Sequence, residues 1–301
     1  MTRRVRRSEL ATPASNDRMF AKAAGSGADL VFLDLEDACA PAEREAARGK
    51  AARALRDLDW GRTTRAIRMN GVDTRWAHGD VIEVVTGARE ALDVIIVPKV
   101  RTARDVWWVD VLLTQLEETL NLRKRIALEV LIEETEGLQN VAEIARSSDR
   151  LEAIIFGAGD FSAAQGAQVD TNFDPIVDYP GDIWHYARSR IVVAARAAGI
   201  DAIDAPFPNY RDPAAYRAAA RQAAAMGYAG KWAIHPGQVG VANEVFAPTP
   251  EEIAHARRLV ATYREAEAGG LGATGLDGML VDAAHLRLAE NVTSRAELLG
   301  L

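Results

Sequence analysis

Residues 30–69, LVFLDLEDACAPAEREAARGKAARALRDLDWGRTTRAIRM, contain the pattern that decides the fold. An apolar, strand-like run at 30–35 is followed by a helical pattern over 41–57 and then by a second strand-like run at 65–69. Two short apolar runs joined through an amphipathic helix are typical of a parallel βα unit. The stretch therefore predicts an α/β protein with a parallel sheet.

The same alternation continues on both sides of this stretch. Eight such units over about 235 residues match a (β/α)₈ TIM barrel, whose usual length is about 250 residues, and we predict that fold. The strands are expected at 9–13, 30–35, 65–69, 94–98, 126–132, 153–156, 202–205 and 230–234. Helices are expected at 17–24, 41–57, 103–119, 137–147, 184–198 and 213–226.

The rival architecture is a doubly wound open sheet. A dinucleotide-binding protein of that kind would carry a glycine-rich phosphate turn directly after an early strand. The candidate glycines, Gly25-Ser26-Gly27, instead end a helical pattern and precede a strand. That order is typical of a helix stop, so the barrel is favoured.

The pattern changes near residue 248, so we expect a barrel over 1–248 and a helical extension over 249–301. Thr249 is the predicted N-cap of the first extension helix, with Pro250 in its first turn and Glu252 completing a capping box. This helix is expected to end near 268. A glycine-rich hinge at about 269–278 and a final helix from about Ala283 follow, so the extension reads as a lid or a subunit-swapped arm.

Composition narrows the function classes. The 301 residues include 36 Lys and Arg against 43 Asp and Glu, a net charge of −7, which argues against nucleic acid as a partner. The single cysteine excludes an intramolecular disulfide framework. No apolar run approaches the roughly 20 residues of a membrane helix, and no signal sequence is evident. The expected compartment is the cytoplasm.

Polar side chains follow almost every predicted strand. In a TIM barrel the carboxyl ends of the strands form one face, which carries the chemistry. A carboxylate-rich set suits a hard divalent cation such as Mg²⁺, with Mn²⁺ as an alternative. For any single residue, a solvated loop is the simpler explanation. The set comprises Glu36, Asp37, Arg68, Asn70, Lys99, Glu133, Asp160, Asp204 and His235.

Motifs at these strand ends resemble the citrate lyase beta subunit superfamily of CoA-ester lyases, which are TIM barrels. The motifs are LDLEDA (33–38), IRMN (67–70), VPKV (97–100), IEETEG (132–137) and GAGDF (157–161). Three further stretches resemble its malyl-CoA/β-methylmalyl-CoA lyase branch: DWGR (59–62), RMNGVDT (68–74) and, most strongly, GKWAIHP (230–236) with its continuation to 246.

The resemblance implies roles for five residues of this chain. Glu133 and Asp160 would ligate Mg²⁺, and Arg68 would bind the substrate's carboxylate or thioester oxygen. Glu36 and Asp37 would hold metal-bound waters, which Mg²⁺ commonly retains.

The resemblance also implies a role for the extension. The segment GMLVD (278–282) looks like the family segment whose aspartate enters a neighbouring subunit's site as acid/base, which makes Asp282 a catalytic candidate. The alternative is that Asp282 only caps the final helix. We accordingly expect a homo-oligomer, a trimer or hexamer, that exchanges its tails.

Further substrate contacts are predicted from charge. Arg18 and Lys22 could meet the CoA phosphates, with help from Arg3, Arg4, Arg6 or Arg7, although a solvated basic face explains them equally well. Lys99 is expected to position a carboxylate, and Asp204 is predicted at the substrate. A structural, hydrogen-bonded role is favoured for His235 over one as a second acid/base.

The expected activity is reversible, Mg²⁺-dependent Claisen-type cleavage. The substrate would be (S)-malyl-CoA or β-methylmalyl-CoA, and the products acetyl-CoA or propionyl-CoA together with glyoxylate. The alternatives are a malyl-CoA thioesterase, a citramalyl-CoA lyase and a non-catalytic subunit of a citrate lyase-like complex. One methyl group separates several of these substrates, a difference worth only about 1–3 kcal/mol in a pocket.

Overall fold

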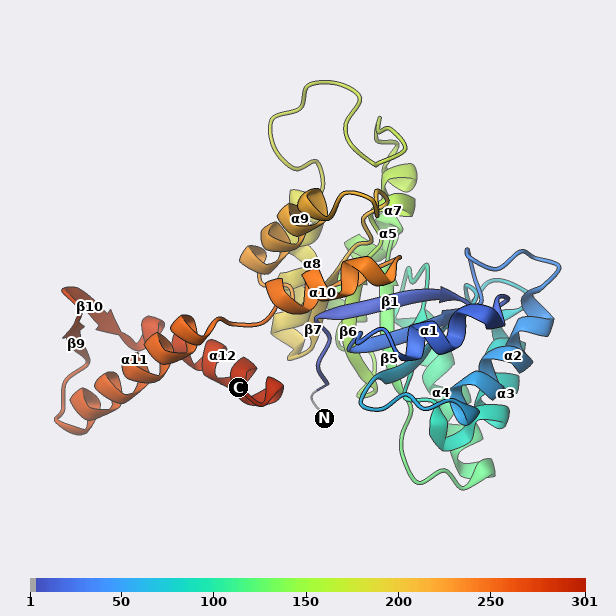
Figure 1. Ribbon diagram of the computed structural model, residues 1–301, viewed down its shortest axis with the longest axis horizontal. Helices are drawn as coiled ribbons and strands as arrows, with labels where there is room; N and C mark the ends of the chain where they lie inside the picture. Colours follow the sequence, from blue (N-terminus) through green and yellow to red (C-terminus); the bar gives the residue numbers. More distant parts are fainter. Residues whose placement is uncertain (1–3) are drawn as a thin grey trace. The chain divides into compact units, whose positions relative to one another are not determined.

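The computed structural model describes residues 4–301 and contains a closed barrel of eight parallel strands (Figure 1). Each strand pairs with the next, and β8 closes the barrel on β1, with Trp232 opposite Glu9. The predicted (β/α)₈ barrel is therefore confirmed. The strands are β1 (Ser8–Pro13), β2 (Leu30–Asp34), β3 (Thr64–Arg68), β4 (Val94–Val97), β5 (Ala127–Ile132), β6 (Leu151–Phe156), β7 (Asp201–Asp204) and β8 (Gly230–Ala233).

Helices surround the strands (Figure 1). They are η1 (Asp17–Met19), α1 (Phe20–Ala24), α2 (Arg44–Asp57), α3 (Ala77–Ala88), η2 (Arg89–Ala91), α4 (Ala103–Leu120), α5 (Thr135–Gln139), α6 (Val141–Ile144), α7 (Ala158–Gln165), α8 (His185–Ala198), α9 (Pro213–Met226) and α10 (Pro236–Val245). One helix expected over 137–147 is instead two short helices that meet at Asn140. The Asn140 side chain donates to the Arg101 carbonyl oxygen at 2.9 Å, and such side-chain bonds compete with continuous helix.

Alternate residues of each strand point into the barrel. Leu30 and Phe32 of β2, Leu131 of β5 and Trp232 of β8 belong to one buried cluster inside it. Because side chains alternate along a strand, the next inward position after Phe32 is Asp34. The same two-residue spacing places polar side chains beyond the apolar interior, at the mouth formed by the carboxyl ends of the strands.

The chain divides into two compact units. The first runs over Arg6–Glu244 and holds the barrel, and the second includes Val245–Leu301. The second unit contains α11 (Pro250–Ala268), β9 (Ala273–Leu276), β10 (Met279–Asp282) and α12 (Ala283–Leu299). Its core is built by Ala256, Leu259 and Tyr263 of α11 against Val281 and Ala289.

The capping box expected at the start of α11 is present. The Thr249 hydroxyl accepts from the Glu252 N–H at 3.2 Å, and the Glu252 carboxylate accepts from the Thr249 N–H at 2.7 Å. The hinge expected at about 269–278 is partly wrong, because β9 and β10 form an antiparallel hairpin there. Its turn is Asp277-Gly278, both with positive φ, a pair that favours tight hairpins.

Candidate active site

Arg68, at the carboxyl end of β3, is the central cation of the barrel mouth. Asp34 of β2 accepts from Arg68 Nε at 2.8 Å and from Nη2 at 2.6 Å, a bidentate ion pair. The remaining nitrogen, Nη1, lies 3.2 Å from Glu36. Burial alone would lower the pKa of Arg68, but the Asp34 carboxylate raises it above its usual value. Arg68 is therefore a fixed, permanently charged group.

Asp34 was not among the predicted site residues. Besides holding Arg68, its carboxylate accepts from the backbone N–H groups of Glu36 at 3.0 Å and of Ala38 at 3.1 Å. Asp34 thus shapes the loop that carries Glu36 and Asp37. Its inward position two residues after Phe32 was the signal that could have identified it.

Lys99 lies among the carboxylates of this face. Its Nζ is 2.5 Å from Glu36, 3.7 Å from Asp37 and 3.5 Å from Asp160. Its backbone has a positive φ of 52°, which is uncommon for a residue with a side chain. Burial alone would lower the pKa of Lys99, but Glu36 and the other carboxylates raise it. This agrees with the predicted role of Lys99 in positioning a carboxylate.

Glu133 follows β5 and Asp160 lies in α7 directly after β6. The Lys99 N–H donates to Glu133 Oε1 at 2.9 Å, so Lys99 contacts both residues. Gly157 lets the backbone approach Glu133: a Cβ there would lie 2.7 Å from Glu133 Oε2. Burial first, and the Glu36 charge second, raise the pKa of Glu133 well above its ordinary value.

Glu36 is the second buried carboxylate of this face. Burial raises its pKa, with Arg68 opposing and Asp37 reinforcing the shift. Together with Glu133 it concentrates negative charge where little water reaches it, an arrangement that a divalent cation would relieve. Among residues 4–301, however, no three His, Cys, Asp or Glu side chains are grouped to enclose a metal unaided.

Asp204 lies outside the barrel interior, which corrects its prediction as a substrate contact. Ile203 points inward, so the neighbouring Asp204 points toward the surrounding helices. It is fully buried there, 2.5 Å from Lys231 Nζ and 3.2 Å from Arg188 Nε. With both cations against it, we assign Asp204 to holding β7, β8 and α8 together.

Asn70 has a structural role behind the mouth. Its backbone and side-chain nitrogens donate to Asp80 at 2.8 Å and 2.7 Å, and its side chain also donates to the Leu35 carbonyl oxygen at 3.0 Å. Arg48 donates to the other Asp80 oxygen at 2.8 Å. The network thus holds the ends of β2 and β3 together.

His235 has the hydrogen-bonded character that was favoured for it, although it is exposed. Its Nδ1 accepts from the Gly237 N–H at 3.0 Å, and its ring stacks on Tyr210 with centroids 5.0 Å apart. These contacts fix the turn between β8 and α10.

Asp282 is in the second unit, where it caps α12. Its Oδ1 accepts from the N–H groups of Ala284 at 2.9 Å and His285 at 3.3 Å, and it lies 2.7 Å from His285 Nδ1. The His285 contacts are the main reason that the pKa of Asp282 is lowered. The predicted cap is therefore present, and these bonds all use Oδ1.

The basic residues predicted to meet CoA differ in accessibility. Arg18 and Lys22 are exposed on η1 and α1. Arg6 is buried and paired with Glu129, which rules out its suggested contact with phosphate, and Arg7 forms an ion pair with Asp29 at 2.8 Å. Arg4 belongs to the second unit, and Arg3 lies outside the described residues.

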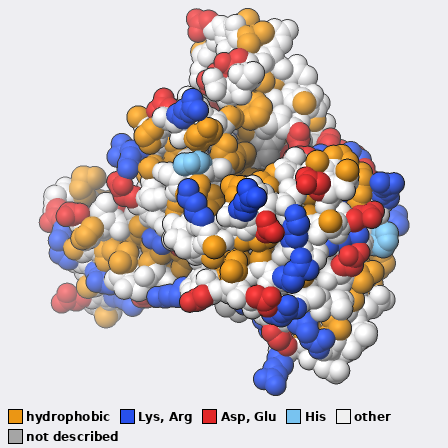
Figure 2. Space-filling model, turned by 45° about the vertical axis from the view of Figure 1, so that its right-hand side comes forward, with side chains coloured by type: hydrophobic (Ala, Val, Ile, Leu, Met, Phe, Trp, Pro, Cys, Tyr) orange, Lys and Arg blue, Asp and Glu red, His pale blue; other side chains and the backbone are white. Residues whose placement is uncertain are grey.

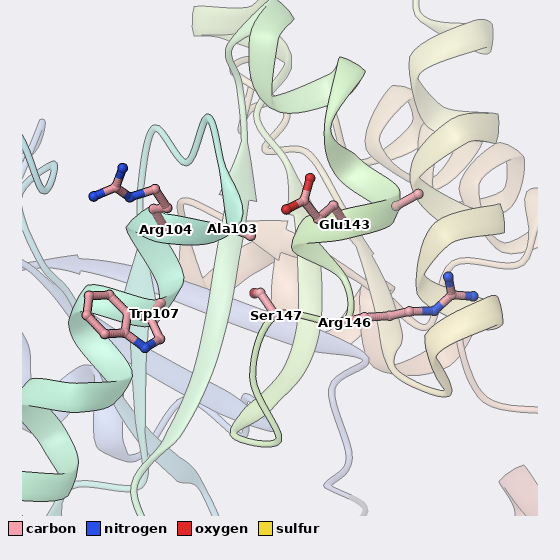
Figure 3. Close-up of a pocket in the computed structure, with 7 residues that line it drawn as sticks. Ala103, Arg104, Trp107, Glu143, Arg146 and Ser147 are labelled. Atoms are coloured by element: carbon pink, nitrogen blue, oxygen red, sulfur yellow. The ribbon is translucent and has the colours of Figure 1, made fainter.

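Two cavities lie away from this mouth. One is an open groove of about 660 Å³ in which Arg104 and Trp107 of α4 lie across from Glu143 and Arg146 (Figure 3). A second cavity of about 410 Å³ is bounded by Trp184 and other residues of the 172–184 segment and α8. Neither is lined by Arg68, Lys99 or Glu133, so the candidate site rests on side-chain convergence and not on cavity size.

Two surface properties bear on partners. Acidic and basic side chains are interspersed over the face drawn in Figure 2, so the net negative charge is not gathered in one patch of that face. Among residues 4–301, no helix is both long and apolar enough to span a membrane.

Comparison with known proteins places these features in a family. The model of the HpcH/HpaI aldolase/citrate lyase family matches residues 7–236. An L-malyl-CoA/beta-methylmalyl-CoA lyase of Rhodobacter capsulatus is 41% identical, covering 98% of this chain and 96% of the relative. A (3S)-malyl-CoA thioesterase of Cereibacter sphaeroides is 34% identical, covering 98% and 95%.

A solved structure agrees with these relatives. The protein CitE of Mycobacterium tuberculosis, crystallised with magnesium, acetoacetate and coenzyme A, superimposes with a TM-score of 0.75 at 30% identity, covering 96% of this chain and 97% of that one. The chain therefore belongs to the HpcH/HpaI aldolase/citrate lyase family, which confirms the resemblance and the enzyme class, a carbon–carbon lyase, predicted from its motifs.

Proposed function

We propose that this chain reversibly cleaves (S)-malyl-CoA or β-methylmalyl-CoA to acetyl-CoA or propionyl-CoA and glyoxylate. The observation that carries the proposal is the convergence of Arg68, Lys99, Glu133 and Asp160 at the barrel mouth, in a chain 41% identical over nearly its whole length to a lyase of that name. Cleavage of this carbon–carbon bond moves negative charge onto the thioester oxygen. A cation held in place at the barrel mouth stabilises that charge.

Glu133 and Asp160 fit a magnesium ion. Both offer carboxylate oxygens, and Gly157 keeps a Cβ out of the space beside Glu133 Oε2. Two protein ligands are enough, because Mg²⁺ usually keeps waters and binds substrate oxygens as well. We assign Glu36 and Asp37 to holding such waters. Bound there, magnesium, or manganese with its similar oxygen preference, supplies Lewis-acid polarisation of the substrate's oxygens.

Arg68 stabilises the charge that develops during cleavage. Asp34 fixes its Nε and Nη2 edge, so the substrate's carboxylate or thioester oxygen is met by a guanidinium that need not reorganise. Lys99 complements this by holding the Glu36 carboxylate at 2.5 Å. The two cations also offset part of the repulsion among the carboxylates of the mouth.

Asp282 is the proposed proton-transfer group. In condensation it would take a proton from the α-carbon of the acyl-CoA. In cleavage the substrate's hydroxyl proton would pass to solvent, and Asp282, protonated from solvent, would give its proton to the α-carbon of the departing acyl-CoA. Three contacts engage its Oδ1, which leaves Oδ2 for this exchange. We propose that it serves a neighbouring subunit of a homo-oligomer, a trimer or hexamer. The exposed Arg18 and Lys22 would meet the CoA phosphates.

The test is product analysis with the purified chain. With malyl-CoA and Mg²⁺ we expect acetyl-CoA and glyoxylate, the latter trapped with phenylhydrazine, no turnover after EDTA, and recovery when Mg²⁺ is restored. Propionyl-CoA and pyruvate, each supplied in the condensation direction, identify the acyl and oxo-acid partners. An enzyme that turns over none of these CoA esters would overturn the proposal and revive a non-catalytic role.

The second candidate is a thioesterase, favoured by the 34% identity to a (3S)-malyl-CoA thioesterase. Water would then attack the thioester carbonyl, releasing free CoA and malate while the carbon–carbon bond survives. The same assay decides between them, because free malate without glyoxylate is the thioesterase result.

A further inference from the structure

We infer that Trp232 is a positioning residue for Arg68: its indole supports the guanidinium plane from inside the barrel. The inference rests on the proposed function, in which Arg68 meets the substrate. Trp232 lies in β8 on the inward side and is only 4% exposed. It belongs to GKWAIHP, the stretch of the sequence that most strongly resembles the family.

Trp232 and Asp34 restrain two different freedoms of Arg68. Asp34 binds the Nε and Nη2 edge of the guanidinium, which fixes the direction of the side chain but leaves the group free to tilt about that edge. The Arg68 Cζ atom lies 5.5 Å from the centroid of the Trp232 ring, within the range of a cation–π contact. The ring thus opposes the tilt, and Nη1 remains directed toward Glu36.

Trp232 is itself held by a residue of the neighbouring strand β1 and by one of β2. Its Nε1 donates to Glu9 Oε2 at 2.8 Å, and its ring packs on Phe32 with centroids 4.5 Å apart. Glu9 is fully buried in β1. A tryptophan at this position therefore has one orientation, because rotating the ring would leave a buried N–H and a buried carboxyl oxygen without partners.

A support of this kind acts on the rate of the chemical step. If the ring is lost, Arg68 keeps its charge and its bond to Asp34, so substrate still binds. The guanidinium is then misaligned with the oxygen where charge develops, and small misplacements of that kind can cost about 100-fold. If Trp232 only filled space in the barrel, its replacement would lower stability and leave the rate of the chemical step unaltered.

The experiment compares Trp232→Leu with the matched control Trp60→Leu. Trp60 is equally buried, 5% exposed, and also donates its indole N–H, to the Ala54 carbonyl oxygen at 3.0 Å, but it packs outside the mouth. We expect both variants to lower Tm. Only Trp232→Leu should lower kcat, by about 10- to 100-fold, with KM for the CoA ester changed less than about threefold.

Two further variants separate support from packing. Glu9→Gln keeps an acceptor for the indole N–H and should retain kcat, whereas Glu9→Leu removes the acceptor and should lower it. A double-mutant cycle with Arg68→Lys should give a loss in kcat smaller than the product of the single losses, because lysine lacks the planar group that the ring supports.

The outcomes separate this inference from the proposed function. Suppose that the wild-type chain cleaves malyl-CoA. If Trp232→Leu then keeps full kcat, or if its loss in kcat simply multiplies with that of Arg68→Lys, the inference is overturned and the proposed function stands. A wild-type chain without lyase activity overturns the proposed function. In that case the Tm values of the same Arg68 and Trp232 cycle decide: non-additive shifts support the contact, and additive shifts overturn it.

Discussion

Glu133 and Asp160, the two proposed magnesium ligands, differ in their environments. Glu133 is 3% exposed and its pKa is raised by burial and by Glu36, whereas the Asp160 side chain is 45% exposed. An ion would therefore be held between a deep carboxylate that benefits from a cation and a shallow one that can open toward solvent. That combination favours a metal ion that binds together with the substrate, or one whose remaining coordination positions are filled by substrate oxygens.

Asp160→Asn tests this arrangement. Removing one ligand charge should weaken apparent magnesium affinity by at least about 10- to 100-fold, because the loss of a residue that only orients a metal ligand typically costs that much. Activity should accordingly recover only at high magnesium. The measurement is lyase rate against magnesium concentration, with Asp57→Asn as control, since Asp57 is exposed and pairs with its neighbour Arg56 at the end of α2. Identical magnesium dependence in Asp160→Asn and wild type would remove Asp160 from the ligand set.

Asp282 has both a structural and a proposed chemical duty, and two substitutions separate them. Asparagine is also a good N-cap, so Asp282→Asn should keep Tm while lowering kcat by about 100-fold or more. Asp282→Ala should lose the same activity and, in addition, about 1 kcal/mol of stability through the cap. Circular dichroism melts and initial rates measure the two effects. Full activity in Asp282→Asn would refute its role in proton transfer.

At the scale of strands, alternation explains which site residues could be predicted. Asp34, Arg68 and Glu133 continue the inward register of β2, β3 and β5, so a correct register finds all three. Asp204 fails the same test because Ile203 is the inward residue. Polarity at the strand ends, taken without the register, places Asp204 in the site and leaves Asp34 out.

Other features could not be read from the pattern. The positive φ of Lys99 breaks the alternation after β4, and the carboxylates that its ammonium group meets, Glu36 and Asp160, follow other strands of the barrel. The β9–β10 hairpin is different, because its Asp277-Gly278 turn between apolar runs is a recognisable hairpin signal. It was masked by the other glycines of that segment, which favoured a hinge.

The barrel interior also carries an acidic pair whose effect on stability depends on pH. Burial, and then the charge of Glu129, raise the pKa of Glu9 well above 4.5. The folded chain thus binds a proton that the unfolded chain releases near its ordinary pKa. Stability should therefore decline as pH rises above about 4.5 and continue to decline until the raised pKa is passed.

Glu9→Gln should flatten this decline and make the chain more stable than wild type at the alkaline end. The amide stays neutral and still accepts the Trp232 N–H, so no buried bond is lost. Urea unfolding midpoints between pH 4.5 and 8.5 measure the slope, with exposed Glu118→Gln on α4 as control. Parallel pH profiles for Glu9→Gln and wild type would show that Glu9 ionises normally.

At the scale of the whole molecule, the proposed reaction needs groups from both compact units. Charge stabilisation and metal binding belong to the barrel, in Arg68, Glu133 and Asp160, whereas the proposed proton-transfer group, Asp282, belongs to the second unit. Sequence motifs identified both sets, because each is local. Which barrel a given Asp282 serves is a property of the assembly, and no local pattern encodes it.

Complementation between two inactive variants answers that question. At a magnesium concentration too low to restore Asp160→Asn, that variant disables the barrel and Asp282→Asn disables the tail, so each homo-oligomer should be nearly inactive. If tails are exchanged between subunits, mixed oligomers contain sites with an intact barrel and an intact incoming tail, and about a quarter to a third of wild-type activity should return. Co-expression with two different affinity tags, followed by tandem purification, isolates the mixed species. If each tail serves its own barrel, no intact site can form, and the mixed oligomers will be as inactive as their parents.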